Sequence, residues 1–147
     1  MEIAEIFTTV AGHLLKQNER SMIEPTSGID PATCAYRGQR GLKCAAGFLI
    51  PDDKYDPVME GAAVVTVRHE KSIPHQERNV EGSNKIYDAL QSIGVDTEKK
   101  MQLVRDLQST HDFFTPDQWS DRLRILAIAY GLDPMLAVKM TSIPATT

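Results

Sequence analysis

The chain has 147 residues, of which 41% are hydrophobic and 24% charged, and its formal net charge at pH 7 is -4. This size and composition are ordinary for one globular domain, so we predict a single domain over residues 1–147. The negative charge argues against a dedicated nucleic-acid surface, which is usually basic. No apolar run approaches the roughly 20 residues that cross a bilayer, which argues against a membrane partner. The acidic N-terminus and the scarcity of cysteine predict a cytoplasmic location.

A first helix is predicted over residues 2–18, because apolar side chains recur there at helical spacing and charged ones fall largely on the other side. These apolar positions are Ile3, Ile6, Phe7, Val10 and Leu14. The prolines, glycine and polar residues of 19–33 then predict a loop. His13 lies near the end of the helix with no partner that the sequence can place, so we interpret it as solvated or partly buried.

The stretch 34–61 is the densest in special residues, since it holds both cysteines, two tyrosines and the one long apolar run. We predict a short strand over 34–37 and then a turn over 38–41, where glycine supplies the positive φ angles that a turn needs. Residues 42–50 fit either a strand or a helix by periodicity. Because alanine is a strong helix former and β-branched residues are nearly absent, a short buried helix is favoured.

Residues 62–67 are short and rich in valine, which predicts a further strand. Residues 68–82 hold proline, histidine and many charged side chains, and we interpret them as an exposed connection. The last third of the chain is predicted to be helical over 83–93, 97–112 and 116–130.

Each of these helices has a start signal in the sequence. Ser83 can cap the first of them and Asp96 the second. Thr115 caps the last, and Gln118 completes a capping box with it. Phe114 and Trp119 are spaced as a hydrophobic staple around this cap, so the start of the last helix is the clearest in the chain.

Together these elements predict an α+β fold that is mostly helical. About four helices, near 2–18, 83–93, 97–112 and 116–130, pack around the buried segment 42–50. A small two- or three-stranded sheet lies at one side.

The two cysteines could be packed thiols, zinc ligands, a disulfide or a nucleophile. Cys34 and Cys44 lie opposite each other if the glycine turn closes a hairpin. A zinc site would need help from His69, His75 or His111, and the spacing matches no common zinc pattern. Cys44 lies in an apolar run, where the pKa of a thiol rises and its reactivity falls. We therefore favour packed thiols and expect no metal, no cofactor and no catalytic residue.

Four acids lie close together at Asp52, Asp53, Asp56 and Glu60. Such carboxylates could bind a divalent cation or transfer protons. The glycine that a calcium loop needs at its sixth position is absent, so a solvated acidic turn is favoured. His111 and Asp112 end a predicted helix, where we expect them to pack and cap rather than to catalyse.

The residues around the glycine turn form the candidate binding site. Arginines beside glycine can hold a phosphate or a carboxylate, although the pattern is not a P-loop. A basic turn followed at once by an acidic one suits protein recognition more than catalysis. Tyrosine and arginine are also common binding hot spots. The candidate binding residues are Tyr36, Arg37, Arg40, Lys43, Asp53, Tyr55 and Asp56.

A longer pattern resembles a group of small uncharacterised proteins of bacteriophages and prophages. It begins at Cys34 and reads Cys-x-Tyr-Arg-Gly-x-x-Gly-Leu-Lys-Cys-Ala-x-Gly-x-Leu-Ile-Pro-Asp, followed by Tyr-Asp-Pro-x-Met-Glu-Gly from Tyr55. Weaker likeness continues in Leu-Gln-x-x-His-Asp from Leu107, and from Trp119 to Leu132. The resemblance implies an accessory phage gene acting in the cytoplasm of a bacterial host cell. That group has no assigned reaction, so it supplies no catalytic residues.

Three classes of function therefore stay open. The favoured one is a non-catalytic accessory protein that binds a bacterial host protein and inhibits or redirects it, for example a component of host defence. The second is a binder of a small anionic ligand, such as a nucleotide signal. The third is a cysteine–histidine enzyme or a zinc protein.

Overall fold

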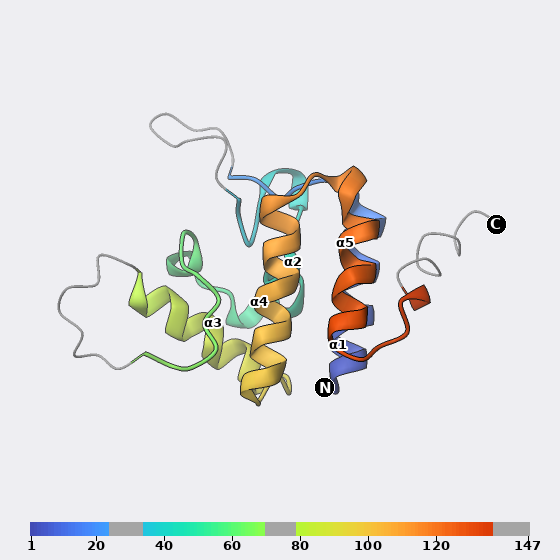
Figure 1. The fold of residues 1–147 in the computed structure, drawn as a ribbon. Coiled ribbons are helices and arrows are strands. Elements are labelled where there is room, and N and C mark those ends of the chain that lie inside the picture. Colours follow the sequence, from blue (N-terminus) through green and yellow to red (C-terminus); the bar gives the residue numbers. More distant parts are fainter. Residues whose placement is uncertain (24–33, 70–78, 137–147) are drawn as a thin grey trace.

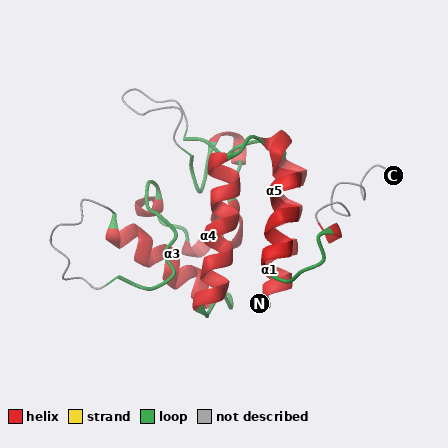
Figure 2. Cartoon of the chain, viewed as in Figure 1, coloured by secondary structure: helices red, strands yellow, loops and turns green. Residues whose placement is uncertain are grey.

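A computed structural model describes residues 1–23, 34–69 and 79–136 (Figure 1). These residues form five α-helices, joined by turns and three short 3₁₀ helices (Figure 2). The α-helices are α1 (Ile3–Gln17), α2 (Ala45–Leu49), α3 (Val80–Ser92), α4 (Glu98–Phe113) and α5 (Pro116–Ala129). The 3₁₀ helices are η1 (Gln39–Gly41), η2 (Asp52–Lys54) and η3 (Pro57–Met59). Predictions that concern 24–33, 70–78 (with His75) and 137–147 lie outside the described residues.

The core forms where α1, α4 and α5 pack against one another, with α2 against α1 and α4. Figure 1 shows α4 and α5 side by side, and α3 reaching away from them to pack on η3. Trp119 of α5 and Phe7 of α1 are fully buried in this core. None of the described helices is both long and apolar enough to cross a membrane.

The four long helices are confirmed, but one of them begins earlier than predicted. The α3 helix is capped by Asn79, whose side-chain oxygen accepts from the amide of Gly82 at 2.8 Å. Ser83, which was expected to be the cap, lies inside the helix. Its hydroxyl donates instead to the carbonyl oxygen of Ala63 at 2.8 Å. The α4 helix is capped by Thr97 and not by the predicted Asp96, because Thr97 Oγ1 accepts from the amide of Lys100 at 3.2 Å. The predicted capping box of Thr115 and Gln118 is present at the start of α5.

The predicted α+β fold is wrong, because the described residues contain no strand and no sheet. Neither 34–37 nor 62–67 has a partner strand there. A single antiparallel bridge joins Met22 to Cys34, so Cys34 does not pair with Cys44 across a hairpin. Side chains bind several backbone groups of these two segments instead. Glu60 accepts from the amides of Tyr36 and Arg37, and the Tyr36 hydroxyl donates to the Ala62 carbonyl. The described part of the fold is therefore helical, and its valine-rich segment 62–67 forms no β-ladder with another described residue.

The segment 42–50 is buried at Cys44–Gly47, Leu49 and Ile50, largely as predicted, whereas Phe48 is exposed, and the central part of the segment is the helix α2. Gly47 is needed inside this helix, because a Cβ atom there would collide with the carbonyl oxygen of Tyr36. Glycine thus lets the backbone of the Tyr36 segment pass directly over α2. This close approach holds the Tyr36 segment against α2.

Candidate functional site

Two of the candidate binding residues, Tyr36 and Arg37, have structural partners. Tyr36 is buried, and its hydroxyl donates to the carbonyl oxygen of Ala62 at 2.5 Å. Burial raises the pKa of this phenol far above its ordinary value. The Arg37 guanidinium donates to the carbonyl oxygens of Gly47 and, at 2.9 Å, of Ile50. Arg37 therefore caps the C-terminal end of α2, where helix carbonyls lack partners.

Glu60 is a central residue of this segment that the sequence interpretation placed in a solvated turn. Its carboxylate accepts from the amides of Tyr36 at 2.9 Å and Arg37 at 3.1 Å, and from the Tyr55 hydroxyl at 2.7 Å. Burial and this bond to Glu60 raise the pKa of Tyr55. The Arg37 guanidinium also lies over the Tyr55 ring, 4.8 Å from its centroid. The motif that begins at Tyr55 contains Glu60, but it does not reveal this role, because the amides of Tyr36 and Arg37 come from a separate part of the chain.

The remaining acids do not converge on one point. Asp56 accepts from the amide of Val58 at 2.9 Å and pairs with Lys85 at 2.9 Å. These two bonds hold the pKa of Asp56 below its ordinary value. Asp52 lies instead beside Arg37 and Lys43, at 3.1 and 3.6 Å.

The glycine turn has the bent backbone that was expected, and its amides are used internally. The Gly38 amide donates to the carbonyl oxygen of Leu42 at 2.9 Å, and the Gln39 amide to that of Met22 at 3.1 Å. Arg40 has a positive φ of 54° and pairs with Glu19 at the surface. The turn therefore does not offer these two amides to an anion.

The exposed part of the segment is centred on Phe48, whose residue surface is 40% exposed. Its ring stacks on the His13 ring, with centroids 4.0 Å apart and an interplanar angle of 6°. The Nε2 atom of His13 lies 2.8 Å from the carbonyl oxygen of Lys43, which fixes the imidazole. The Lys43 ammonium in turn contacts Asp52. We call His13, Lys43, Phe48 and Asp52 the Phe48 face.

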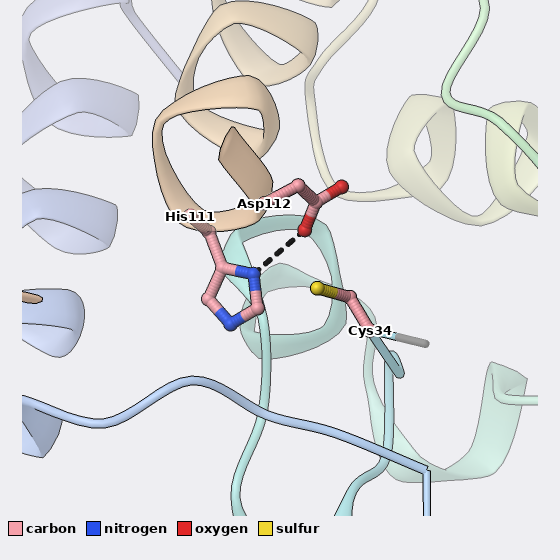
Figure 3. A group of neighbouring side chains, drawn as sticks. All are labelled: Cys34, His111 and Asp112. Carbon is pink, nitrogen blue, oxygen red and sulfur yellow. Dashed lines mark hydrogen bonds and ion pairs between the residues drawn. The ribbon is translucent and has the colours of Figure 1, made fainter. Parts of the chain in front are cut away.

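A second group of polar side chains lies at the end of α4. Figure 3 shows Cys34, His111 and Asp112 converging, with their ligand atoms within 4.8 Å of one another. The Nδ1 atom of His111 lies 2.7 Å from Asp112 Oδ1. The thiol of Cys34 also lies 3.8 Å from the thioether sulfur of Met22. These residue types could bind a metal or form a catalytic triad, so their protonation decides what they can do.

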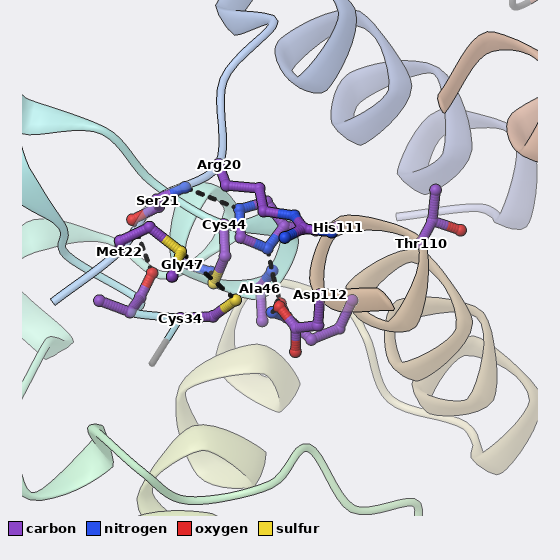
Figure 4. Close-up of polar contacts among 12 residues, drawn as sticks. Arg20, Ser21, Met22, Cys34, Cys44, Ala46, Gly47, Thr110, His111 and Asp112 are labelled. Atoms are coloured by element: carbon purple, nitrogen blue, oxygen red, sulfur yellow. Dashed lines mark hydrogen bonds and ion pairs between the residues drawn. The ribbon is translucent and has the colours of Figure 1, made fainter. Parts of the chain in front are cut away.

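The tautomer of His111 is set by a backbone amide (Figure 4). The Ser21 amide donates to Nε2 at 2.9 Å, so Nε2 carries the lone pair. Nδ1 then carries the proton and donates it to Asp112. A metal at Nδ1 would need this proton to leave and would turn Nε2–H toward the Ser21 N–H. Neither nitrogen is free to ligate a metal or to accept a proton from Cys34 without rearrangement.

The two thiols are also in unreactive surroundings. Burial and the nearby Asp112 carboxylate raise the pKa of Cys34 to about 12. Cys44 is fully buried, and desolvation raises its pKa strongly. Both line a pocket of about 340 Å³ together with Gln108. Because the thiolate is the reacting form, neither cysteine is set up as a nucleophile at neutral pH.

Gln108 and Asp112 tie this cluster to the core instead. The Ala46 amide at the start of α2 donates to Gln108 Oε1 at 2.9 Å. Gln108 Nε2 then donates to Asp112 Oδ1 at 2.9 Å. The chain of bonds runs from α2 through α4 to the Ser21 backbone. The expected packing role of His111 and Asp112 fits this geometry.

Comparison with known proteins identified no matching family model, no matching curated protein and no matching solved structure.

Proposed function

We propose that this chain is a non-catalytic binding protein of the bacteriophage accessory type, which binds a bacterial host protein and inhibits or redirects it. The observation that carries the binding role is the Phe48 face, an exposed aromatic ring held in one orientation among charged side chains. Aromatic side chains are enriched at protein interfaces. A ring that is ordered before binding loses less entropy when a partner covers it. The phage context rests on the sequence resemblance.

The charges linked to this face suit a protein partner. The Lys43 carbonyl binds the imidazole that stacks on Phe48, and the Lys43 ammonium contacts Asp52, so both signs of charge are present. An apolar centre with a polar rim is the common anatomy of a protein interface. Tyr36 and Arg37 have structural roles instead, since their polar groups are bonded within the chain.

The other two functions receive less support from the same region. An anion site would use the Arg37 guanidinium and the turn amides, which already have internal partners. A cysteine enzyme or zinc site would need a free nitrogen on His111, and the Ser21 amide and Asp112 engage both. Binding of a protein partner through the Phe48 face would not require these internal hydrogen bonds to break, whereas the other two functions would.

The test is affinity capture from a bacterial lysate with three forms of the chain. Wild type, Phe48→Ala and Phe113→Ala are compared, because Phe113 is also exposed, at 76%, but lies at the end of α4. We expect one captured protein to be lost with Phe48→Ala and retained with Phe113→Ala. Each variant must first melt within a few degrees of wild type. A partner that Phe48→Ala captures as well as wild type does would place the interface elsewhere.

A further inference from the structure

Two sulfur atoms lie close together beside the end of α4. The thioether sulfur of Met22 is 3.8 Å from Cys34 Sγ, as Figure 4 shows. These two residues face each other across an antiparallel bridge, so their side chains leave the backbone on the same side. Next to the bridge, the Ala35 amide donates to the Ser21 carbonyl at 2.9 Å. The Met22 amide donates to Gln39 Oε1 at 2.8 Å, so bonded backbone holds both sulfurs in place.

The separation of the two sulfurs fits a shared metal ion. With metal–sulfur bonds of about 2.3 Å, a sulfur–sulfur distance of 3.8 Å gives an angle of about 110° at the metal. An ion can also reach the thiol, since Cys34 lines the pocket of about 340 Å³. Asp112 and His111 have ligand atoms within 4.8 Å of the thiol sulfur (Figure 3). The site thus offers two sulfur ligands with a carboxylate beside them.

The ligand atoms indicate which ion this site would take. Thiolate and thioether sulfurs are soft ligands, and together they favour Cu(I). A zinc ion would need four ligands, and both nitrogens of His111 already have hydrogen-bond partners. A Cu(I) ion is stable with two or three ligands. It can therefore bind to the sulfurs while His111 keeps its bonds to Ser21 and Asp112.

We propose that Met22 and Cys34 bind one Cu(I) ion through their two sulfur atoms. The S–H bond of Cys34 breaks and an S–Cu bond forms. The proton passes to the thiolate that leaves when a small-thiol complex delivers the ion, and no atom is oxidised or reduced. One positive charge replaces another, so binding does not change the net charge beside Asp112. This site is separate from the Phe48 face and does not rest on the binding function proposed for it.

The protonated thiol makes the site depend on displacement of a proton by the metal. Burial and the nearby Asp112 carboxylate raise the pKa of Cys34 to about 12, so the free chain keeps this proton at neutral pH. A metal that binds a thiolate must remove it, and its affinity therefore rises with pH. One proton should be released for each ion bound, which gives a readout besides the affinity.

The experiment uses the full chain without oxygen, and supplies Cu(I) as its coloured complex with the chelator bicinchoninate. We expect the wild-type chain to withdraw one Cu(I) ion and to release one proton. Copper X-ray absorption should show two sulfur neighbours. Because Cu(I) also binds thiols of unfolded chains, the melting temperature is measured as well. It should rise with Cu(I), since only an ion that prefers the folded chain stabilises it.

Four variants locate the site. Met22→Leu keeps the size of the side chain and removes the thioether, so it should weaken Cu(I) binding about tenfold or more. Its matched control is Met135→Leu, which changes an exposed methionine outside the cluster and should have no effect. Cys34→Ser should abolish binding. Phe48→Ala should leave it unchanged, so failure of this proposal and failure of the binding function can be told apart.

Three results would overturn the copper site. The first is a wild-type chain that takes no Cu(I) from the chelator. The second is Met22→Leu binding Cu(I) as tightly as wild type, which would leave the thioether without a role. The third is Zn(II) binding at Cys34 as tightly as Cu(I), because a site of two soft sulfur ligands should discriminate against zinc.

Discussion

At the scale of single residues, Arg37 shows how a candidate binding residue becomes a structural one. Glu60 was expected to lie in a solvated acidic turn, and it also has a structural role. In the fold, Arg37 caps α2 and Glu60 binds two backbone amides and a tyrosine hydroxyl. A charged side chain with several internal bonds contributes to stability more than to recognition. Phe48, which is 40% exposed, belongs to the surface that we propose for binding.

Arg37→Ala should destabilise the chain by about 2–4 kcal/mol, because it leaves helix carbonyls of α2 without a donor. The matched control is Arg40→Ala, which removes an arginine that is well exposed and paired only at the surface. That change should cost about 0.5 kcal/mol or less. Urea melts of both variants check this, and similar losses would contradict the capping role of Arg37.

His13 makes the stability depend on pH. Burial lowers its pKa from the ordinary 6.5, an effect larger than the opposing bond to the Lys43 carbonyl. The unfolded chain therefore binds the proton more readily than the folded chain. The contribution of neutral His13 to the free energy of unfolding is therefore fully present above pH 6.5. It is lost as the pH falls from 6.5 toward the lower pKa of the folded state.

His13→Gln keeps a donor for the Lys43 carbonyl and removes the titration. We expect the difference in unfolding free energy between pH 7.5 and pH 5 to be smaller in this variant than in wild type. Urea melts at the two pH values provide the measurement. An unchanged difference would show that His13 does not titrate with folding.

At the scale of elements, α5 begins at Pro116 after its cap Thr115, as the sequence predicted. The two aromatic residues around this cap, Phe114 and Trp119, are not equivalent. Trp119 is fully buried and its indole nitrogen donates to the Phe114 carbonyl at 3.0 Å. Phe114 is only partly buried, and the Arg122 guanidinium lies over its ring. The two aromatic residues of the predicted staple therefore differ in how much of their surface is buried.

Trp119→Ala should cost about 3–5 kcal/mol, because it empties a fully buried site. Phe114→Ala should cost less, about 1–2 kcal/mol, since its ring is partly in water. Gln118→Ala, which breaks only the capping box, should cost about 1 kcal/mol or less. Three urea melts decide the order, and equal losses would argue against this description of the helix start.

In the helix α2, the substitution Gly47→Ala is informative because the sign of its effect on stability tests the packing of this helix. Replacing glycine by alanine inside a helix normally stabilises by up to about 1 kcal/mol. At Gly47 the new Cβ would meet the Tyr36 carbonyl, so we expect Gly47→Ala to destabilise by about 1–3 kcal/mol instead. A raised melting temperature would show that the two segments can move apart at little cost.

At the scale of the whole molecule, one set of buried side chains connects the elements. Ile86 and Leu90 of α3 belong to the same hydrophobic cluster as Phe7 of α1 and Trp119 of α5. The described helices thus share one core, and a single domain over 1–147 stays a prediction. The shared core also means that α3 should not unfold by itself, although it packs away from α5.

We therefore expect one cooperative unfolding transition. Fluorescence of Trp119, the single tryptophan, reports on α5, whereas far-ultraviolet circular dichroism reports on all helices. The two curves should coincide in urea. A separate early loss of helical signal would show that α3 forms an independent unit.

The sequence by itself determined the four long helices, the buried segment 42–50 and the cap of α5. These features depend on side-chain spacing and on residues a few positions apart, which are contained in the local sequence. The packed thiols followed in the same way for Cys44, because it lies in an apolar run.

Only the tertiary structure decided that the described residues form no sheet, and which role each site residue has. Strand propensity at 62–67 is real, but a strand needs a neighbour, and the described fold supplies side chains such as Asn84 in its place. His111 lies beside Cys34, and Glu60 beside Tyr36, because segments far apart in the sequence pack together. A pattern along the chain contains no record of such contacts, so it could not tell the structural residues of the segment 34–61 from its exposed ones.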